Sequence, residues 1–354
     1  MNIINVIEDM EVLARMKNNN AIQPNHLSKE TKVSMRTRII TAIIIAVVGI
    51  PPAILGGWFF VFLITAILIL GTYEIIHCAK RKYNPALYIV AILLAGVMTF
   101  WPLFRQLPTL IINGVPQDFR IYSSFDDIYI SFSVLILGVF GLFFMTLIDK
   151  GFTVRDATFI FTMTFVLSLG LQSALFLRYN PQVVYYSYLS SVPPKSFNLY
   201  DNLNSSFLLF YIVIGTFMTD IGAYFIGVFF GRNKINPRIS PKKTWEGFFG
   251  GLIISSSVSF GVVMLFINCF KTDLIVGVLD MEHWYLILLL SLIIPAVATL
   301  GDFVYSSIKR SYDIKDFSRL LPGHGGILDR IDSLIFSFLT SAAFIILFCY
   351  WSQL

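Results

Sequence analysis

The sequence predicts an all-α fold, namely a polytopic integral membrane protein with about nine transmembrane helices and a cytoplasmic N-terminus. Of its 354 residues, 56% are hydrophobic and only 13% are charged, whereas soluble domains carry about a quarter charged residues. The mean hydropathy is +0.75. Apolar windows of about 20 residues, enough to cross roughly 30 Å of hydrocarbon, recur along the whole chain.

Nine such windows can be placed, and they define the expected helices. They cover residues 37–56, 58–77, 86–104, 128–148, 157–177, 206–230, 247–270, 283–301 and 331–352. Because nine is an odd number, the two termini are expected on opposite sides of the membrane. We divide the chain into N-terminal transmembrane helices at 37–205 and a C-terminal region at 206–354, whose cytoplasmic loops hold the residues suited to catalysis.

The N-terminal residues 1–36 are interpreted as a cytoplasmic tail. They are polar and precede an apolar run that is too long for the core of a signal peptide. Within the tail Ile3, Ile7, Met10 and Leu13 lie at near-helical spacing. The tail therefore contains either a short interfacial helix or no regular structure.

The distribution of Lys and Arg sets the orientation, because cytoplasmic loops carry an excess of both. With the N-terminus inside, only five of the 26 basic residues fall outside, namely Arg105, Arg120, Arg178, Lys195 and Lys271. The loops at 231–246 and 302–330 then share the cytoplasmic face. If the chain is bacterial, its expected location is the plasma (cytoplasmic) membrane, with any joint site facing the cytosol.

Cysteine and histidine give little sign of a metal centre of their own. Cys78, Cys269 and Cys349 stand alone in apolar runs without CxxC spacing, so neither a disulfide framework nor a zinc site is indicated. Of the four histidines only His324 lies among other polar groups. The chain also lacks nucleic-acid motifs, and positive-inside topology with anionic lipid explains its pI near 9.0. No nucleic-acid partner is expected.

Asp220 is the most unusual residue within a predicted span. It lies about ten residues before the basic loop, hence roughly 15 Å below the end of its helix. An ionisable residue at that depth costs about 2.5–3.5 kcal/mol on insertion scales and is a functional candidate by default. The alternative is a carboxylate paired with a basic side chain for packing. Gly222, Ala223 and Gly227 are small and permit close helix approach in either case.

The basic loop at 231–246 leads into a predicted helix start. Its cations are Arg232, Lys234, Arg238, Lys242 and Lys243. Thr244 is a possible N-cap with Glu246 in the first turn, so the lysines precede an electropositive helix end that would hold a polyphosphate. The alternative is a loop that obeys the positive-inside rule or binds anionic headgroups.

Carboxylates and basic residues alternate between 302 and 333. Asp302 and Asp329 are each suited to give an oxygen to a divalent cation, with Asp332 one helical turn beyond Asp329 on the same face. Mg²⁺ prefers such oxygen ligands together with substrate phosphates. Three glycines around His324 supply flexible backbone and bare N–H groups. The alternative is a set of surface salt bridges.

Together these motifs resemble those of the phosphatidate cytidylyltransferase (CDP-diacylglycerol synthase) family. The stretch SSIKRSYDIKDFSRLLPGHGGILDRID matches the family's C-terminal signature in register, from Ser306 to Asp332. The block TDIGAYFIGVFFGRNKINPRISPKKTWEG and the preceding Gly301-Asp302 pair match as well. The resemblance is close over residues 206–333, and Glu74 is a possible further family position.

The resemblance implies that the chain transfers the cytidylyl group of CTP to phosphatidic acid, giving CDP-diacylglycerol and pyrophosphate with Mg²⁺ and possibly a second metal ion. It implies metal ligation by Asp302 and Asp329. Residues given catalytic roles are Asp302, Asp329, Lys309, Arg310 and His324. Residues given substrate-binding roles are Asp220, Arg232, Lys234, Ser240, Lys242, Lys243, Thr244, Glu246, Ser306, Lys315, Gly325, Gly326, Arg330 and Asp332. The division of the basic residues between CTP and the lipid phosphate stays open. The family also suggests a homodimer.

Two rival functions remain at this point. A CTP-dependent lipid kinase of the dolichol-kinase type would move the γ-phosphate and release CDP. An ion or lipid transporter would use Asp220 as its transported-ion site, although the charged residues cluster at one membrane face and no convincing inverted repeat is present.

Overall fold

The computed structural model describes residues 29–104, 110–112, 115–117, 124–179, 199–275 and 277–351. The expected interfacial helix at residues 3–13 lies outside these ranges. Helix α2 (Lys29–Leu55) begins inside the stretch that the sequence assigned to the tail.

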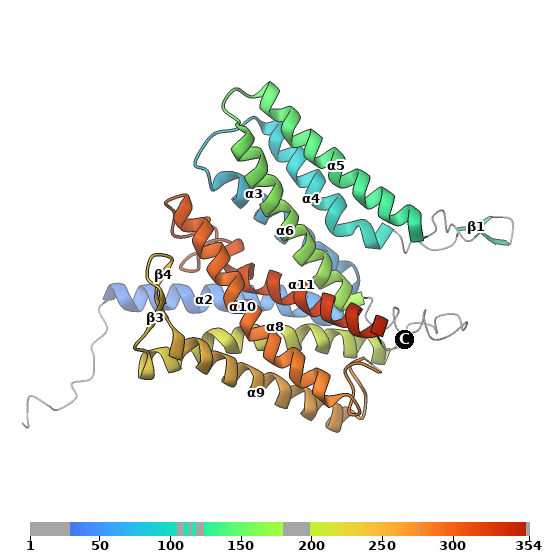
Figure 1. Ribbon diagram of the computed structural model, residues 1–354, viewed down its shortest axis with the longest axis vertical. Coiled ribbons are helices and arrows are strands. Elements are labelled where there is room, and N and C mark those ends of the chain that lie inside the picture. Colours follow the sequence, from blue (N-terminus) through green and yellow to red (C-terminus); the bar gives the residue numbers. More distant parts are fainter. Residues whose placement is uncertain are drawn as a thin grey trace, which may run out of the picture.

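The N-terminal half consists of helices and one small hairpin. After α2 come α3 (Gly57–His77), α4 (Pro85–Phe104), α5 (Ser124–Ile148) and α6 (Val154–Tyr179). Between α4 and α5, the strands β1 (Leu110–Ile112) and β2 (Val115–Gln117) pair antiparallel. Figure 1 shows α3, α4, α5 and α6 side by side as one group of helices.

The C-terminal half contains the regions where the sequence placed the site. Its helices are α8 (Leu199–Phe230), α9 (Trp245–Phe270), α10 (Trp284–Ser311) and α11 (Leu328–Trp351). Between α8 and α9, β3 (Lys234–Asn236) and β4 (Ser240–Thr244) form an antiparallel hairpin (Figure 1). From the sequence this stretch was expected only as a basic loop leading into a helix.

The all-α membrane architecture is confirmed, and each predicted window coincides with one helix. Among the described residues, seven helices are long and apolar enough to cross a membrane, namely α2, α3, α6, α8, α9, α10 and α11. Helices α4 and α5 contribute the shorter apolar stretches Pro85–Phe100 and Leu135–Ile148. The chain is thus an integral membrane protein, and the count of nine spans stays a prediction.

Small residues bring α8 and α9 into close contact, as their sequence predicted. A Cβ atom added at Gly251 of α9 would lie 2.8 Å from the carbonyl oxygen of Thr219, and one added at Gly247 would lie 2.8 Å from that of Ala223. The Ser255 hydroxyl also donates to the Gly215 carbonyl over 2.6 Å. Such packing and interhelical hydrogen bonds hold helices together in lipid, and here they fix α8 against the start of α9.

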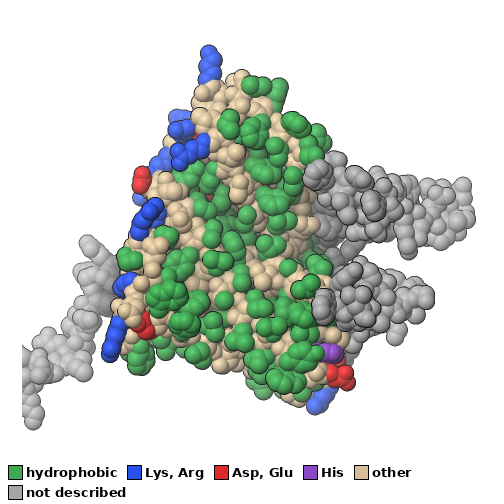
Figure 2. Space-filling view, viewed as in Figure 1, with side chains coloured by type: hydrophobic (Ala, Val, Ile, Leu, Met, Phe, Trp, Pro, Cys, Tyr) green, Lys and Arg blue, Asp and Glu red, His purple; other side chains and the backbone are tan. Residues whose placement is uncertain are grey.

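Charge and hydrophobicity divide the surface of the bundle. Figure 2 shows Lys and Arg side chains along one edge of the molecule and hydrophobic side chains over its body. The β3–β4 hairpin lies at that edge (Figure 1), which we call the charged end. Large apolar side chains such as Phe59, Leu137 and Leu147 are exposed on the body, as expected for a surface that contacts lipid.

Candidate active site

The start of α9 is built as the sequence predicted. Thr244 is the N-cap, and its hydroxyl accepts a hydrogen bond from the Gly247 amide over 3.1 Å. The Glu246 carboxylate, in the first turn, accepts from the backbone amides of Arg232 and Asn233 at 3.1 Å. Glu246 therefore ties the β3–β4 hairpin to the helix start, which is a positioning contact within the chain.

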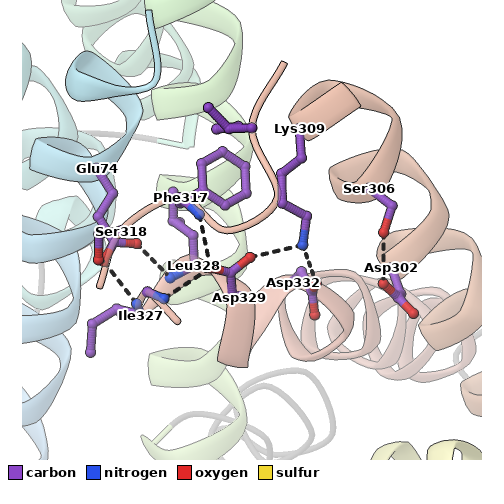
Figure 3. Close-up of polar contacts among 12 residues, drawn as sticks. Glu74, Asp302, Ser306, Lys309, Phe317, Ser318, Ile327, Leu328, Asp329 and Asp332 are labelled. Atoms are coloured by element: carbon purple, nitrogen blue, oxygen red, sulfur yellow. Dashed lines mark hydrogen bonds and ion pairs between the residues drawn. The ribbon is translucent and has the colours of Figure 1, made fainter. Parts of the chain in front are cut away.

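Lys243 connects the hairpin to α10. Its ammonium group forms an ion pair with Asp302 and lies 4.4 Å from the ring centroid of Phe303. The other Asp302 oxygen accepts a hydrogen bond from the Ser306 hydroxyl over 3.1 Å (Figure 3). Because side chains alternate along a strand, the neighbouring Lys242 points the other way and is exposed.

Three carboxylates from three helices interact electrostatically near Lys243. Asp220 of α8 and Asp302 of α10 each repel the charge of Asp332 of α11, and Asp302 also repels Asp220. Lys243 and Arg330 attract the carboxylate of Asp220. Asp220 therefore lies within electrostatic range of the signature carboxylates, and its role in substrate binding stays a prediction.

Lys309 and Asp329 form the most buried ion pair of the site. The Lys309 ammonium donates to one Asp329 oxygen over 2.8 Å and lies 4.0 Å from the Asp332 carboxylate (Figure 3). The other Asp329 oxygen accepts from the backbone amides of Phe317 and Gly326, each at 2.9 Å. Asp329 thus holds both a lysine and the loop between α10 and α11, and Asp332 follows on the same helix face as predicted.

Glu74, which the sequence suggested only as a possible family position, proves to be a main support of this loop. It is buried near the end of α3. Its carboxylate accepts from the Ser318 hydroxyl over 2.7 Å and from the backbone amides of Ile327 and Leu328 over 2.8 and 2.9 Å (Figure 3). These amides open α11, so Glu74 satisfies donors at a helix N-terminus from a distant helix.

The glycines of the signature allow these close approaches. A Cβ atom added at Gly326 would lie 2.5 Å from a Glu74 carboxylate oxygen. Gly325 has a φ of +85° and would place a Cβ 2.9 Å from the Asp329 carboxylate. No side chain larger than hydrogen fits between the loop and its two carboxylates, which explains why Gly-Gly precedes the start of α11.

The remaining predicted residues divide between two places. Lys315, His324 and Arg330 line a cavity of about 670 Å³ at the loop between α10 and α11. The Arg310 guanidinium donates to the carbonyl oxygens of Ile314 and Ile239 over 2.9 and 3.4 Å, so it links the end of α10 to the hairpin. Ser240 is partly buried in the hairpin, whereas Arg232 and Lys234 are exposed.

Carboxylate oxygens, the ligand atoms that Mg²⁺ prefers, come from three helices at this site. Asp220, Asp302 and Asp332 supply carboxylate oxygens whose mutual repulsion a cation would relieve. The Tyr305 hydroxyl, near Asp332, is buried and has no hydrogen-bond partner within the described ranges. In those ranges no three His, Cys, Asp or Glu side chains already stand in metal-ligand geometry. Lysines now neutralise Asp302 and Asp329, and metal ligation by these residues stays a prediction.

The cysteines described here do not supply a nucleophile. Cys78 is buried at the end of α3, and burial raises the pKa of its thiol to about 12. Cys269 is exposed on α9, away from the charged end. A thiol of such high pKa stays protonated and unreactive at neutral pH.

An apolar helical bundle that gathers carboxylates, lysines and a helix N-terminus at one end defines an integral membrane protein with a site suited to phosphate groups. A model of the cytidylyltransferase family matches residues 36–348. The chain is 31% identical over 310 residues to the phosphatidate cytidylyltransferase of Bacillus subtilis (strain 168), which covers 86% of this chain and 95% of that protein. The chain belongs to the cytidylyltransferase family.

Two further relatives carry the same name. A Staphylococcus saprophyticus protein is 30% identical over 302 residues, covering 85% of this chain and 95% of its own length. A Haemophilus influenzae protein is 42% identical over 135 residues, which is 38% of this chain and 44% of that relative. The resemblance stated from the sequence motifs is thereby confirmed.

Proposed function

We propose that the protein is a phosphatidate cytidylyltransferase that transfers the cytidylyl group of CTP to phosphatidic acid. The observation that carries this proposal is the convergence of Lys243, Lys309 and three carboxylates at one end of an apolar bundle, beside the N-terminus of α9. A lipid acceptor stays in the bilayer while CTP arrives from water, and a site at this end meets both.

The reaction needs positioning and charge neutralisation more than covalent chemistry. A phosphate oxygen of phosphatidic acid attacks the α-phosphorus of CTP, and the bond from that phosphorus to the β-phosphate bridging oxygen breaks. Pyrophosphate leaves with the bonding electrons, so CDP-diacylglycerol and pyrophosphate are the only products. Negative charge develops on the phosphate oxygens in the transition state. Positively charged side chains that are already held in place stabilise this charge and lower the activation barrier.

The lysines are held in place for this task by residues that do not react. Lys309 is fixed by Asp329, which is itself fixed by the loop amides of Phe317 and Gly326. Lys243 is held against Asp302 at the end of the hairpin. Both ammonium groups can therefore meet phosphate oxygens without first being ordered, which reduces the entropic cost of binding.

Mg²⁺, when bound, would neutralise phosphate charge and align the triphosphate, and Asp302 with Asp220 and Asp332 is the set best suited to hold it. Asp329 already uses both oxygens within the chain, so it fits a metal less well in this arrangement. A second metal ion and a homodimer remain part of the proposal. We place the site on the cytosolic face of a bacterial plasma membrane.

Acceptor specificity tests the proposal against the lipid-kinase alternative. Purified protein is given CTP, Mg²⁺ and either phosphatidic acid or diacylglycerol, and the products are separated. We expect CDP-diacylglycerol from phosphatidic acid and nothing from diacylglycerol. Phosphorylation of diacylglycerol with release of CDP would favour the kinase. Failure to consume CTP with either acceptor would favour a transporter.

A further inference from the structure

A basic cavity lies where the N-terminal helices meet the loop between α10 and α11. It has a volume of about 670 Å³, and its lining includes Arg38 and Arg319, which are not among the site residues expected from the sequence. Lys315 and Arg330 bring two more cations, against the single carboxylate of Asp316. This excess of positive charge suits an anion of two or more charges.

One residue of the cavity lining has an unsatisfied polar atom. His324 contributes to the lining, and its Nδ1 atom is buried with no hydrogen-bond partner among the residues that the structure describes. A buried ring nitrogen of this kind normally has a partner. An oxygen of a bound phosphate group would provide one.

Helix α2 attaches directly to the cavity loop. The Thr41 hydroxyl donates to the Pro322 carbonyl over 2.9 Å. A Cβ atom added at Gly323 would lie 2.9 Å from the Arg38 side chain. Arg38 therefore lies beside the loop, and the attachment of α2 to the loop keeps it there.

The same end of α2 presents an apolar face to lipid. Ile39, Ile40, Ile43 and Ile44 follow Arg38 and are all exposed large apolar side chains. Leu320, next to Arg319 in the loop, is exposed as well. A phosphate in the cavity that carried acyl chains could lay them on this surface, whereas a nucleotide gains nothing from it.

Arg330 joins the cavity to the carboxylate cluster. It lines the cavity and is also near enough to Asp220 to attract its charge. A phosphate bound beside Arg330 would therefore lie within electrostatic range of the carboxylate cluster.

We propose that this cavity binds the phosphomonoester headgroup of the acceptor lipid through Arg38 and Arg319, with the acyl chains along the exposed face of α2. This assignment rests on the proposed function and divides the basic residues. Arg38 and Arg319 serve the lipid, while Lys243 and Lys309 serve the triphosphate.

The kinetic test compares Arg38→Gln and Arg319→Gln with the wild type in mixed micelles, varying the mole fraction of phosphatidic acid and the concentration of CTP separately. Loss of one charge-assisted contact should raise the KM for phosphatidic acid on the order of 10-fold. The KM for CTP and kcat should change less than about twofold, and Arg38→Lys should recover part of the loss because it keeps a point charge. Lys150→Gln, an exposed cation on another connection, is the matched control and should behave as wild type.

Three outcomes would overturn the assignment. A rise in the KM for CTP alone would show that the cavity binds the nucleotide and not the lipid. A fall in kcat with both KM values unchanged would show that Arg38 positions the loop and does not bind the lipid phosphate. Unchanged kinetics in both variants would show that the cavity takes no part.

A binding measurement separates this assignment from the proposed function. Wild-type protein and Arg38→Gln are mixed, without CTP, with nanodiscs containing either phosphatidic acid or phosphatidylglycerol, and retained lipid is counted by mass spectrometry. Preference for phosphatidic acid that Arg38→Gln loses supports the cavity even if no CDP-diacylglycerol is ever formed. Equal retention of the two lipids by the wild type contradicts it.

Discussion

Lys309 of α10 and Asp329 of α11 are joined by an ion pair of 2.8 Å whose side chains are only 10% and 2% exposed. Breaking a buried pair by removing one partner leaves an uncompensated charge, which typically costs about 3–5 kcal/mol. This pair therefore supports the site and the junction of the two helices at once.

Asp329→Asn is predicted to lose both stability and activity. The amide has no charge for Lys309, and its single oxygen can accept either from Lys309 or from the amides of Phe317 and Gly326, whereas the carboxylate uses one oxygen for each task. We expect a fall in Tm of several degrees in detergent and little remaining turnover. Removing both charges, as Lys309→Ala with Asp329→Ala, should cost less stability than the sum of the single changes. Additive losses would show that the pair is not coupled.

Asp302→Asn is predicted to lose activity but not stability. Its side chain is 26% exposed, so neutralising it should leave Tm unchanged while kcat falls on the order of 100-fold. Removing divalent ions with EDTA should abolish wild-type turnover, and Mg²⁺ should restore it. Residual activity of Asp302→Asn should require more Mg²⁺ than the wild type. Near-normal turnover with an unchanged Mg²⁺ requirement would remove Asp302 from the metal site.

Glu74→Gln should loosen the loop without touching either substrate. The glutamine retains one oxygen for the amides of Ile327 and Leu328 but loses the negative charge that meets the start of α11. Hydrogen bonds to charged groups contribute about 1.5–3 kcal/mol each, so we expect a lower Tm and a reduced kcat with small changes in KM. Glu74→Asp, which keeps the charge on a shorter side chain, should recover part of the activity. A variant with wild-type kcat and Tm would show that the loop keeps its structure without the charge of Glu74.

Gly326→Ala tests the close approach of the loop to Glu74. The added methyl group would meet a carboxylate oxygen at 2.5 Å, which is closer than real contacts allow. We expect loss of most activity in a turnover assay and a lower Tm. Gly96→Ala is the control, because a Cβ atom there has nothing within 4 Å and alanine favours the helix. Equal activity in the two variants would contradict the proposed geometry.

Local features of the site could be predicted from the sequence. The Thr244 cap depends on residues within one turn, and the shared face of Asp329 and Asp332 follows from helical spacing alone. The hydrophobic windows also located every α-helix within the described residues, because membrane spans are determined by a continuous run of apolar residues. The start of α2 at Lys29 was missed since its first turns are polar.

Contacts between distant segments could not be predicted. Glu74 meets Leu328 across more than 250 residues of sequence, and the available signals were its acidity within an apolar span and its possible match to a family position. Arg38 looked like one more cytoplasmic cation, yet it reaches the loop at Gly323. The pairing of Asp329 with Lys309 could not be predicted from the sequence either, because a carboxylate among basic residues can bind a metal ion or pair with a lysine. Helix packing decides between these options.

The most direct test of the central claim follows the two ends of the triphosphate. Purified protein in detergent is given CTP labelled at the α- or the γ-phosphate, with phosphatidic acid and Mg²⁺ present or withheld in turn. We expect the α label to enter the lipid and the γ label to leave as pyrophosphate, only when lipid and metal are both present. Entry of the γ label into the lipid, or no consumption of CTP under any condition, would contradict it.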